Sequence, residues 1–163
     1  MTMSESEFVA RYGGIYEHSA WVAELAAPIV AGLTDVERIA EVMADCVDNA
    51  SRKKQLALIR AHPDLVGKAQ IAGELTRDST HEQASAGLDQ CTAEEYTRFQ
   101  NLNRDYHEKF GFPFVMAVRN SSRAEILAAF DSRLGNDPDT EFETALAEIH
   151  KIARLRLDAL DQN

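Results

Sequence analysis

The hydrophobic residues of this chain recur at the spacing of α helices. One segment shows steps of three and four residues between neighbouring positions, at Tyr96, Phe99, Asn103, Tyr106 and Phe110. The segment near the C-terminal end shows the same helical spacing, at Phe142, Leu146, Ile149, Ala153 and Leu160. Side chains at such steps lie on one face of a helix, which can pack against a core. The pattern predicts helices over most of the chain.

Polar residues and glycines mark where these helices begin and end. The pattern Ser/Thr-x-x-Glu predicts a helix start, because its two side chains cap the first turn reciprocally. It recurs along the chain, at Ser4 and Glu7, Thr34 and Glu37, Ser79 and Glu82, Thr92 and Glu95, and Ser122 and Glu125. Asp137 before Pro138 predicts a further helix start. The glycines that predict helix ends are Gly13, Gly14, Gly32, Gly87, Gly111 and Gly135.

One apolar stretch, FPFVMAV at residues 112–118, is the extended candidate of the chain. It is too short and too isolated to build a sheet. The fold class is therefore predicted to be all-α. We expect a single domain over residues 1–163, formed by a bundle of about eight helices with one short apolar extended loop.

Composition and charge exclude several classes of protein. A chain of 163 residues with 45% hydrophobic residues can bury one sizeable core. Its net charge of -10 argues against binding to nucleic acid or to an anionic membrane, and an anionic ligand needs a local cationic group. The apolar run from Trp21 to Leu33 contains Glu24 and Pro28 and is too short to span a bilayer.

The cysteines and histidines show no spacing that is typical of a metal site. Cys46 and Cys91 lie far apart, and five histidines are scattered along the chain. We therefore expect no metal and no disulfide. The N-terminal residues MTMSESEF lack the order of a secretory signal peptide, which favours a cytoplasmic location.

His62 lies in the sequence AHPDL, directly after a segment with helical character at residues 51–60. One interpretation is structural, because a proline ends a helix and a histidine near a helix C-terminus interacts favourably with the helix dipole. The other is that a rigid break presents an imidazole to a pocket. The residues alone leave both interpretations open.

The run STHEQ at residues 79–83 also has two interpretations. Ser79 and Glu82 fit a capping box, which would explain both of them structurally. Glu82 can nevertheless face a pocket, and Gln83 carries hydrogen-bond donors as well as acceptors.

Arg156 falls within the apolar stripe of the last predicted helix. Counting about 100° per residue from Phe142, Arg156 lies at about -40°, whereas Arg154 lies at about 120°, off the stripe. A buried arginine needs a partner, either a carboxylate such as Glu82 or an anionic ligand. A structural ion pair and a ligand-binding role both remain open.

The apolar loop at residues 112–118 can simply fill the core. An extended segment among helices also leaves backbone N–H and C=O groups that need partners. A planar, amide-rich ligand would supply them.

Several sequence blocks together resemble one known family. They are AHPDL at residues 61–65, STHEQASAGL at 79–88, FGFPFVMAV at 110–118 and EIHKIARLRL at 148–157. YGGIYEHSAWVAE at residues 12–24 is similar as well. In this order and at this spacing, the blocks resemble the signature of the OHCU decarboxylases over nearly the whole chain.

The resemblance implies an all-α and usually dimeric enzyme of urate degradation. Such enzymes convert 2-oxo-4-hydroxy-4-carboxy-5-ureidoimidazoline to (S)-allantoin and carbon dioxide without a metal or an organic cofactor. By the same resemblance the catalytic residues are His62, Glu82 and Arg156. The substrate contacts that it implies are Pro63, Ser79, Gln83, Phe114, Val115, Met116, Ala117 and Val118, the last five through their backbone.

Two other functions stay open from the residues themselves. The chain could be a helical interaction module without catalysis, which would leave AHPDL and Arg156 explained only as structure. It could also be a lyase or hydrolase that acts on another ureide through the same residues. In the leading interpretation the expected partners are a small ureide substrate and a second copy of the chain, with no nucleic acid and no membrane.

Overall fold

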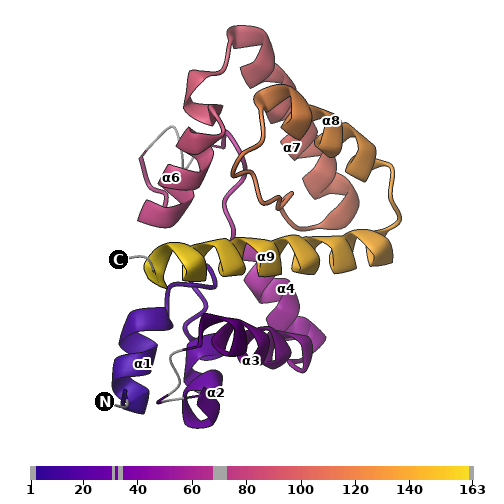
Figure 1. Cartoon of the computed structure of the whole chain (residues 1–163). Coiled ribbons are helices and arrows are strands. Elements are labelled where there is room, and N and C mark those ends of the chain that lie inside the picture. The colour runs from indigo at the N-terminus through magenta and orange to yellow at the C-terminus, as the bar shows by residue number, and fades with distance from the viewer. Residues whose placement is uncertain (1–2, 31, 33–34, 68–72, 162–163) are drawn as a thin grey trace. The chain divides into compact units, whose positions relative to one another are not determined.

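The computed structural model of the protein describes residues 3–30, 32, 35–67 and 73–161. Within these ranges the chain forms α helices and one short 3-10 helix, with no strand, which confirms the all-α prediction. In chain order (Figure 1) the elements are α1 (Glu5–Tyr12), α2 (Trp21–Val30), α3 (Val36–Asp48), α4 (Arg52–Arg60), α6 (Arg77–Ser85), η1 (Leu88–Gln90), α7 (Ala93–Phe110), α8 (Arg123–Leu134) and α9 (Pro138–Asp161).

The chain divides into two compact units. The first unit holds Met1–Ala61 and Ile149–Asn163, and the second holds His62–Glu148. Helix α9 therefore contributes its first part to the second unit and its last part to the first unit. A single domain over residues 1–163 stays a prediction.

The first unit is built around the packing of α1 on α2 and of α2 on α3. Their inward faces are apolar and almost fully buried, and they include Phe8, Val22, Ala26, Val30, Ile39, Met43 and Val47. In α3 the buried positions follow steps of three and four residues, as expected for a helix with one side against a core.

Aromatic rings fill the core of the second unit around Tyr106 of α7. The ring centroids of Phe110, Phe112, Phe114 and Phe130 lie 4.5, 5.9, 5.5 and 5.8 Å from that of Tyr106. Edge-to-face pairs of this kind add to the free energy gained by burying the rings. The predicted face of α7 is thus confirmed at its centre.

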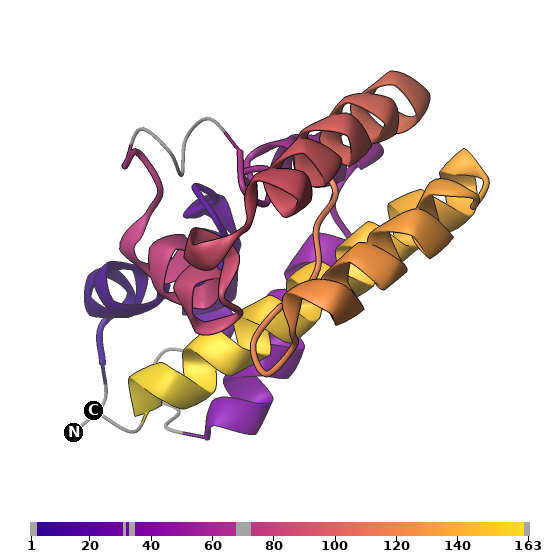
Figure 2. The ribbon, with the colours of Figure 1, turned by 90° about the horizontal axis from the view of Figure 1, so that it is seen from above.

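Residues 112–118 form a buried, non-helical loop between α7 and α8, as predicted. Figures 1 and 2 show that this loop returns along the helices that it joins, so that α7 and α8 run in the same direction. Its side chains take part in the aromatic core, where Phe114 stacks on Phe130 with 3.9 Å between ring centroids. The loop therefore both fills the core and connects two parallel helices.

Several predicted helix starts are confirmed by the capping contacts. Thr92 and Ser122 each accept from the backbone N–H of the glutamate three residues on, and that glutamate caps in return. Asp137 accepts from the backbone N–H of Thr140 at 2.9 Å, and α9 begins at Pro138. This hydrogen bond holds the pKa of Asp137 below its usual range. Thr34 lies outside the described residues.

The predicted capping box of Ser79 and Glu82 is wrong. Helix α6 is capped by Thr76, whose side chain accepts from the backbone N–H of Ser79 at 3.2 Å. Ser79 is therefore the third residue of the helix, and it is buried. Thr76 competes for the same position because threonine is also a good N-cap, and local sequence does not decide between two neighbouring caps.

Candidate active site

His62 lies just beyond the end of α4, where the backbone leaves the helix at Ala61. Pro63 follows, so the predicted helix break is confirmed. The His62 side chain is only 7% exposed, whereas a histidine that merely ends a helix at the surface would be solvated. The break therefore directs an imidazole into the interior of the protein.

The backbone after His62 is held by amide side chains from α6 and α7. Gln83 accepts from the N–H of Val66 at 3.1 Å and donates to the carbonyl of Asp64 at 3.4 Å. Asn103 donates to the carbonyl of Leu65 at 2.9 Å, and Gln100 donates to the carbonyl of Val66 at 2.6 Å. These bonds satisfy backbone groups that no helix or strand could pair.

Val66 shows that this segment is strained as well as fixed. Its φ angle is 53°, in the left-handed region, which is rare for a β-branched residue. Strain of this kind persists only where surrounding contacts enforce it, and it is often found at functional sites. Here the contacts of Gln83 and Gln100 with both backbone groups of Val66 enforce it.

Helix α6 carries three of the residues that the sequence singles out. Ser79 and Gln83 are buried one turn apart on the same face, and Glu82 beside them is half-buried. Both ends of the Gln83 amide hold the segment after His62. The predicted site residues from His62 to Gln83 belong to the second unit, together with the loop at 114–118.

Arg156 belongs to the other unit, on the last turns of α9. It is 6% exposed, and it donates from Nη2 to a carboxylate oxygen of Glu17 at 2.9 Å and from Nη1 to the carbonyl of Ile15 at 3.3 Å. Arg154 is only half-buried and pairs with Asp158 one turn on, at 3.1 Å. The helical phase predicted for the two arginines is confirmed.

The segment that binds Arg156 is anchored to α9 at a second place. Tyr16 is hydrogen-bonded to Nδ1 of His150 at 2.9 Å, and Nε2 of His150 lies 2.9 Å from a carboxylate oxygen of Asp48. An ionised Asp48 only accepts, so it pairs with a protonated Nε2, and in the neutral imidazole Nδ1 then accepts from the Tyr16 hydroxyl. Burial, and then the charge of Asp48, raises the pKa of Tyr16 well above its usual range.

Two backbone groups of the loop at 114–118 are bound by charged side chains. Arg133 donates from Nη1 to the carbonyl of Val115 at 2.7 Å. The backbone N–H of Ala117 donates to a carboxylate oxygen of Glu148 at 3.1 Å. The protein itself therefore supplies partners for part of this loop.

Other chemistry is limited among the residues that the structure describes. They contain no group of three or more His, Cys, Asp or Glu side chains that could hold a metal ion. Burial raises the pKa of both thiols, and the neighbouring Asp45 and Glu95 raise those of Cys46 and Cys91 further, which disfavours the reactive thiolate. Within the same ranges no helix is long and apolar enough to cross a membrane.

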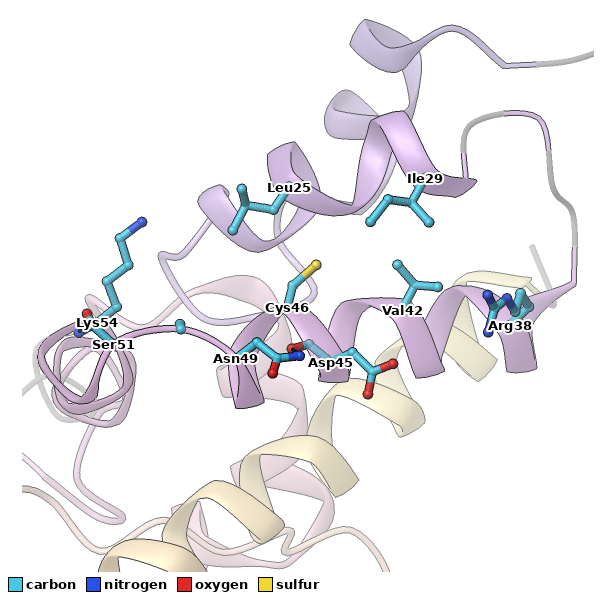
Figure 3. A pocket seen from close by; sticks show the side chains of 10 residues that line it. Leu25, Ile29, Arg38, Val42, Asp45, Cys46, Asn49, Ser51 and Lys54 are labelled. Atoms are coloured by element: carbon cyan, nitrogen blue, oxygen red, sulfur yellow. Dashed lines mark hydrogen bonds between the residues drawn. The ribbon is translucent and has the colours of Figure 1, made fainter.

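A groove of about 540 Å³ lies between α2 and α3 of the first unit, but it lacks the predicted site residues. Figure 3 shows Leu25 and Ile29 of α2 facing Cys46 and Val42 of α3 across it. Lys54, at one end, lies over the ring of Trp21 at 5.1 Å. The groove offers an apolar surface rather than a constellation for acid–base chemistry.

Sequence reasoning missed several residues that support the site. Glu17 is 2% exposed yet lies outside any helix, where an acidic residue ordinarily indicates a solvated turn. Gln100 and Arg133 gave no periodic signal either. Asn103 did, because it is a polar residue in the middle of an aromatic helix face, and its buried amide turns out to hold Leu65.

Comparison with known proteins shows which family the sequence matches. The sequence model described as OHCU decarboxylase matches residues 1–158. The chain belongs to the OHCU decarboxylase family. The sequence blocks that resemble this family, from AHPDL at residues 61–65 to EIHKIARLRL at 148–157, all lie within the matched range.

Individual proteins that resemble the chain differ in how much of their own length it covers. The 2-oxo-4-hydroxy-4-carboxy-5-ureidoimidazoline decarboxylase of Haloferax volcanii is 46% identical, with 95% of this chain and 89% of that protein covered. The enzyme of the same name from Mus musculus is 38% identical, with 98% and 89% covered. A crystal structure of (S)-allantoin synthase is 36% identical with a TM-score of 0.75, and it covers 96% of this chain and 50% of that chain.

Proposed function

We propose that this protein decarboxylates 2-oxo-4-hydroxy-4-carboxy-5-ureidoimidazoline to (S)-allantoin and carbon dioxide during the degradation of urate. The observation that carries the proposal is the match of the OHCU decarboxylase family over residues 1–158. Decarboxylases of this name are similar to the chain at up to 46% identity in the comparisons above. The protein is accordingly a carboxy-lyase.

The reaction needs an acceptor for the electrons of the bond that breaks. When the bond between the ring carbon and the carboxylate carbon breaks, its electron pair forms a C=C bond with the neighbouring ring carbon. The pair displaced from the ring C=N bond takes up a proton at nitrogen. The ring hydroxyl then becomes a carbonyl by losing its proton, and the neighbouring carbon receives a proton on one face. One proton is consumed for each carboxylate lost, and no separate electron acceptor is required.

His62 is the residue that we assign to proton transfer. An imidazole has an ordinary pKa near 6.5, so it can both donate and accept a proton at neutral pH. Its burial and the rigid break at Pro63 support the assignment, because stereospecific protonation needs a fixed donor. We assign Glu82 to orienting the imidazole or contacting the substrate through its negative charge.

Arg156 and the loop at 114–118 are assigned to substrate binding. The planar guanidinium can bind a carboxylate or a ureido carbonyl through two parallel N–H groups, which a lysine cannot do. In this proposal Arg156 binds the anionic substrate in addition to its ion pair with Glu17, as the local cation in a protein with a net charge of -10. Pro63, Ser79 and Gln83 complete the proposed set of contacts.

Three further properties belong to the proposal, the location from the N-terminal residues and the other two from the family resemblance. They are independence of metals and organic cofactors, a cytoplasmic location, and a homodimeric state. Chelation with EDTA tests the first of them, since activity is expected to survive it. Loss of activity on chelation with recovery on adding zinc would contradict it.

The experiment that tests the function follows the handedness of allantoin. Urate is oxidised in a cuvette with and without the protein, and circular dichroism records the product. Without a protein the proton reaches both faces of the ring, and the allantoin is racemic. We expect a growing (S)-allantoin signal with the protein. The same racemic product at the same rate in both reactions would overturn the proposal.

A further inference from the structure

A buried carboxylate in the second unit takes no part in the proposed chemistry. Glu141 of α9 is 0% exposed, and its oxygens accept from Tyr106 at 2.6 Å, from Nε of Arg133 at 2.6 Å and from Asn136 at 3.0 Å. Burying a carboxylate is costly unless donors compensate for the water that it loses. The donors come from α7, from α8 and from the turn after α8. The carboxylate of Glu141 therefore links these three segments to α9 by hydrogen bonds.

Arg133 extends this contact to the loop at 114–118. From Nη1 it donates to the carbonyl of Val115 at 2.7 Å, and its guanidinium carbon lies 4.3 Å from the ring centroid of Phe114. Phe114 in turn stacks on Phe130. One side chain thus fixes both a backbone group and a ring of the loop.

Helix α9 holds the same loop at a second point. Glu148 follows Glu141 by seven residues, about two turns of helix, so the two carboxylates lie on the same face of α9. Glu148 accepts from the backbone N–H of Ala117 at 3.1 Å. The loop is therefore held at residue 115 through Arg133 and Glu141, and at residue 117 directly.

We propose that Arg133 and Glu141 are positioning residues for substrate binding. They set the position of the loop backbone that receives the ureide, and they do so without contacting the substrate. The inference rests on the proposed function, which assigns the loop at 114–118 to substrate contacts. Contacts that hold substrate and transition state equally affect KM rather than kcat. Loosening the loop therefore weakens binding and leaves proton transfer at His62 almost unchanged.

The variant that tests this is Arg133→Lys. An ammonium group can stay beside Glu141, but it lacks the planar fork that also reaches the Val115 carbonyl. We expect KM to rise by about fivefold to tenfold, the net worth of one ordinary hydrogen bond, with kcat within about twofold of the wild type. The dissociation constant of (S)-allantoin, measured by calorimetry, should rise by the same factor.

Arg123 provides a matched control on the same helix. Its Nε donates to both carboxylate oxygens of Glu95 at 3.0 and 3.1 Å, and its Nη1 donates to the carbonyl of Gly87 at 3.0 Å. The chemistry is that of Arg133, but the backbone segment that it holds is a different one. Arg123→Lys should therefore lower the melting temperature without a change in KM or in (S)-allantoin binding.

The outcomes separate the positioning role from a purely structural one. Equal KM values for Arg133→Lys and Arg123→Lys, or a loss confined to kcat, would overturn the inference. If Arg133→Lys does not fold, the double variant Arg133→Met with Glu141→Gln replaces it, because removing both charges leaves neither buried alone. That variant should show the same rise in KM. A wild-type protein without activity would contradict the proposed function itself, whereas an active one with unchanged KM in both variants contradicts the positioning role alone.

Discussion

The segment after α4 and the loop after α7 both need hydrogen-bond partners for their backbone groups, and they find them in different ways. Both are non-helical stretches inside a helical unit, so their backbone groups have no ladder to pair with. At residues 64–66 the backbone is bound by neutral amides from α6 and α7. In this region the proposed functional group is a side chain, the imidazole of His62. At residues 112–118 the side chains fill the aromatic core, and the backbone, which Arg133 and Glu148 hold at Val115 and Ala117, is the part that we propose contacts the substrate.

This contrast predicts which substitutions matter in each region. Where a side chain carries out the reaction, its chemistry sets the rate, so even a conservative substitution should lower activity. Where the backbone contacts the substrate, the side chains serve packing, and a substitution of similar volume should be tolerated. Charged residues hold the loop and neutral amides hold the segment after His62, so the two regions also respond differently to removal of a charge.

The largest effect is expected at His62. His62→Asn should lower kcat by about 10²–10⁴, the usual worth of a positioned acid or base, because asparagine cannot transfer a proton. Steady-state kinetics and a melting curve measure it. His81→Asn is the matched control, since His81 is an exposed histidine on α6, and it should leave kcat unchanged. Equal kcat values in the two variants would restore the structural interpretation of AHPDL.

Glu82→Gln should have the next largest effect on catalysis. Because Thr76 caps α6, this substitution removes no helix cap, and we expect near-normal melting. The loss of the negative charge should lower kcat by about tenfold to a hundredfold, as for a hydrogen bond to a charged group. Glu94→Gln, at an exposed glutamate in the first turn of α7, is the control. Normal activity in Glu82→Gln would show that its charge has no catalytic role.

In the first unit, Arg156 is the side chain whose substitution we expect to affect activity. Arg156→Lys keeps the charge but loses the fork, so we expect kcat/KM to fall by about tenfold or more, at least about 1.4 kcal/mol. Arg154→Lys changes a half-buried pair with Asp158 and should stay within about 0.5 kcal/mol. Kinetics and melting curves of both variants check this. If Arg156→Lys loses stability but keeps full kcat/KM, its contact with Glu17 is structural only.

The smallest effect is expected in the loop that presents its backbone. Met116 is half-buried, and Met116→Leu keeps its volume, so stability should change by less than about 1.5 kcal/mol. The value of kcat/KM should change by less than about fivefold, because the proposed substrate contacts of the loop come from its backbone. A fall as large as that of Arg156→Lys would mean that the side chain of residue 116 contacts the substrate, and the contrast between the two regions would fail.

The local part of the structure was readable from the sequence. The caps at Thr92 and Ser122, the helix start at Pro138 and the break at Pro63 all depend on residues within four positions of one another. The same holds for the phase of Arg156, because a helix repeats every 3.6 residues whatever surrounds it. Ser79 shows the limit, since two neighbouring caps compete and only the folded turn selects Thr76.

The helices, the apolar loop, the burial of Arg156 and, through the combined blocks, the family can all be inferred from the amino-acid sequence. The contacts that hold these residues in place are visible only in the folded protein. Glu17 reaches Arg156 across 139 positions of sequence, and Glu141 reaches Tyr106 across 35. Such pairs leave no periodic trace, because the chain brings them together only after the helices have packed. The helical periodicity therefore predicts that Arg156 is buried, but only the packing of the helices determines which residues pair with a buried charge.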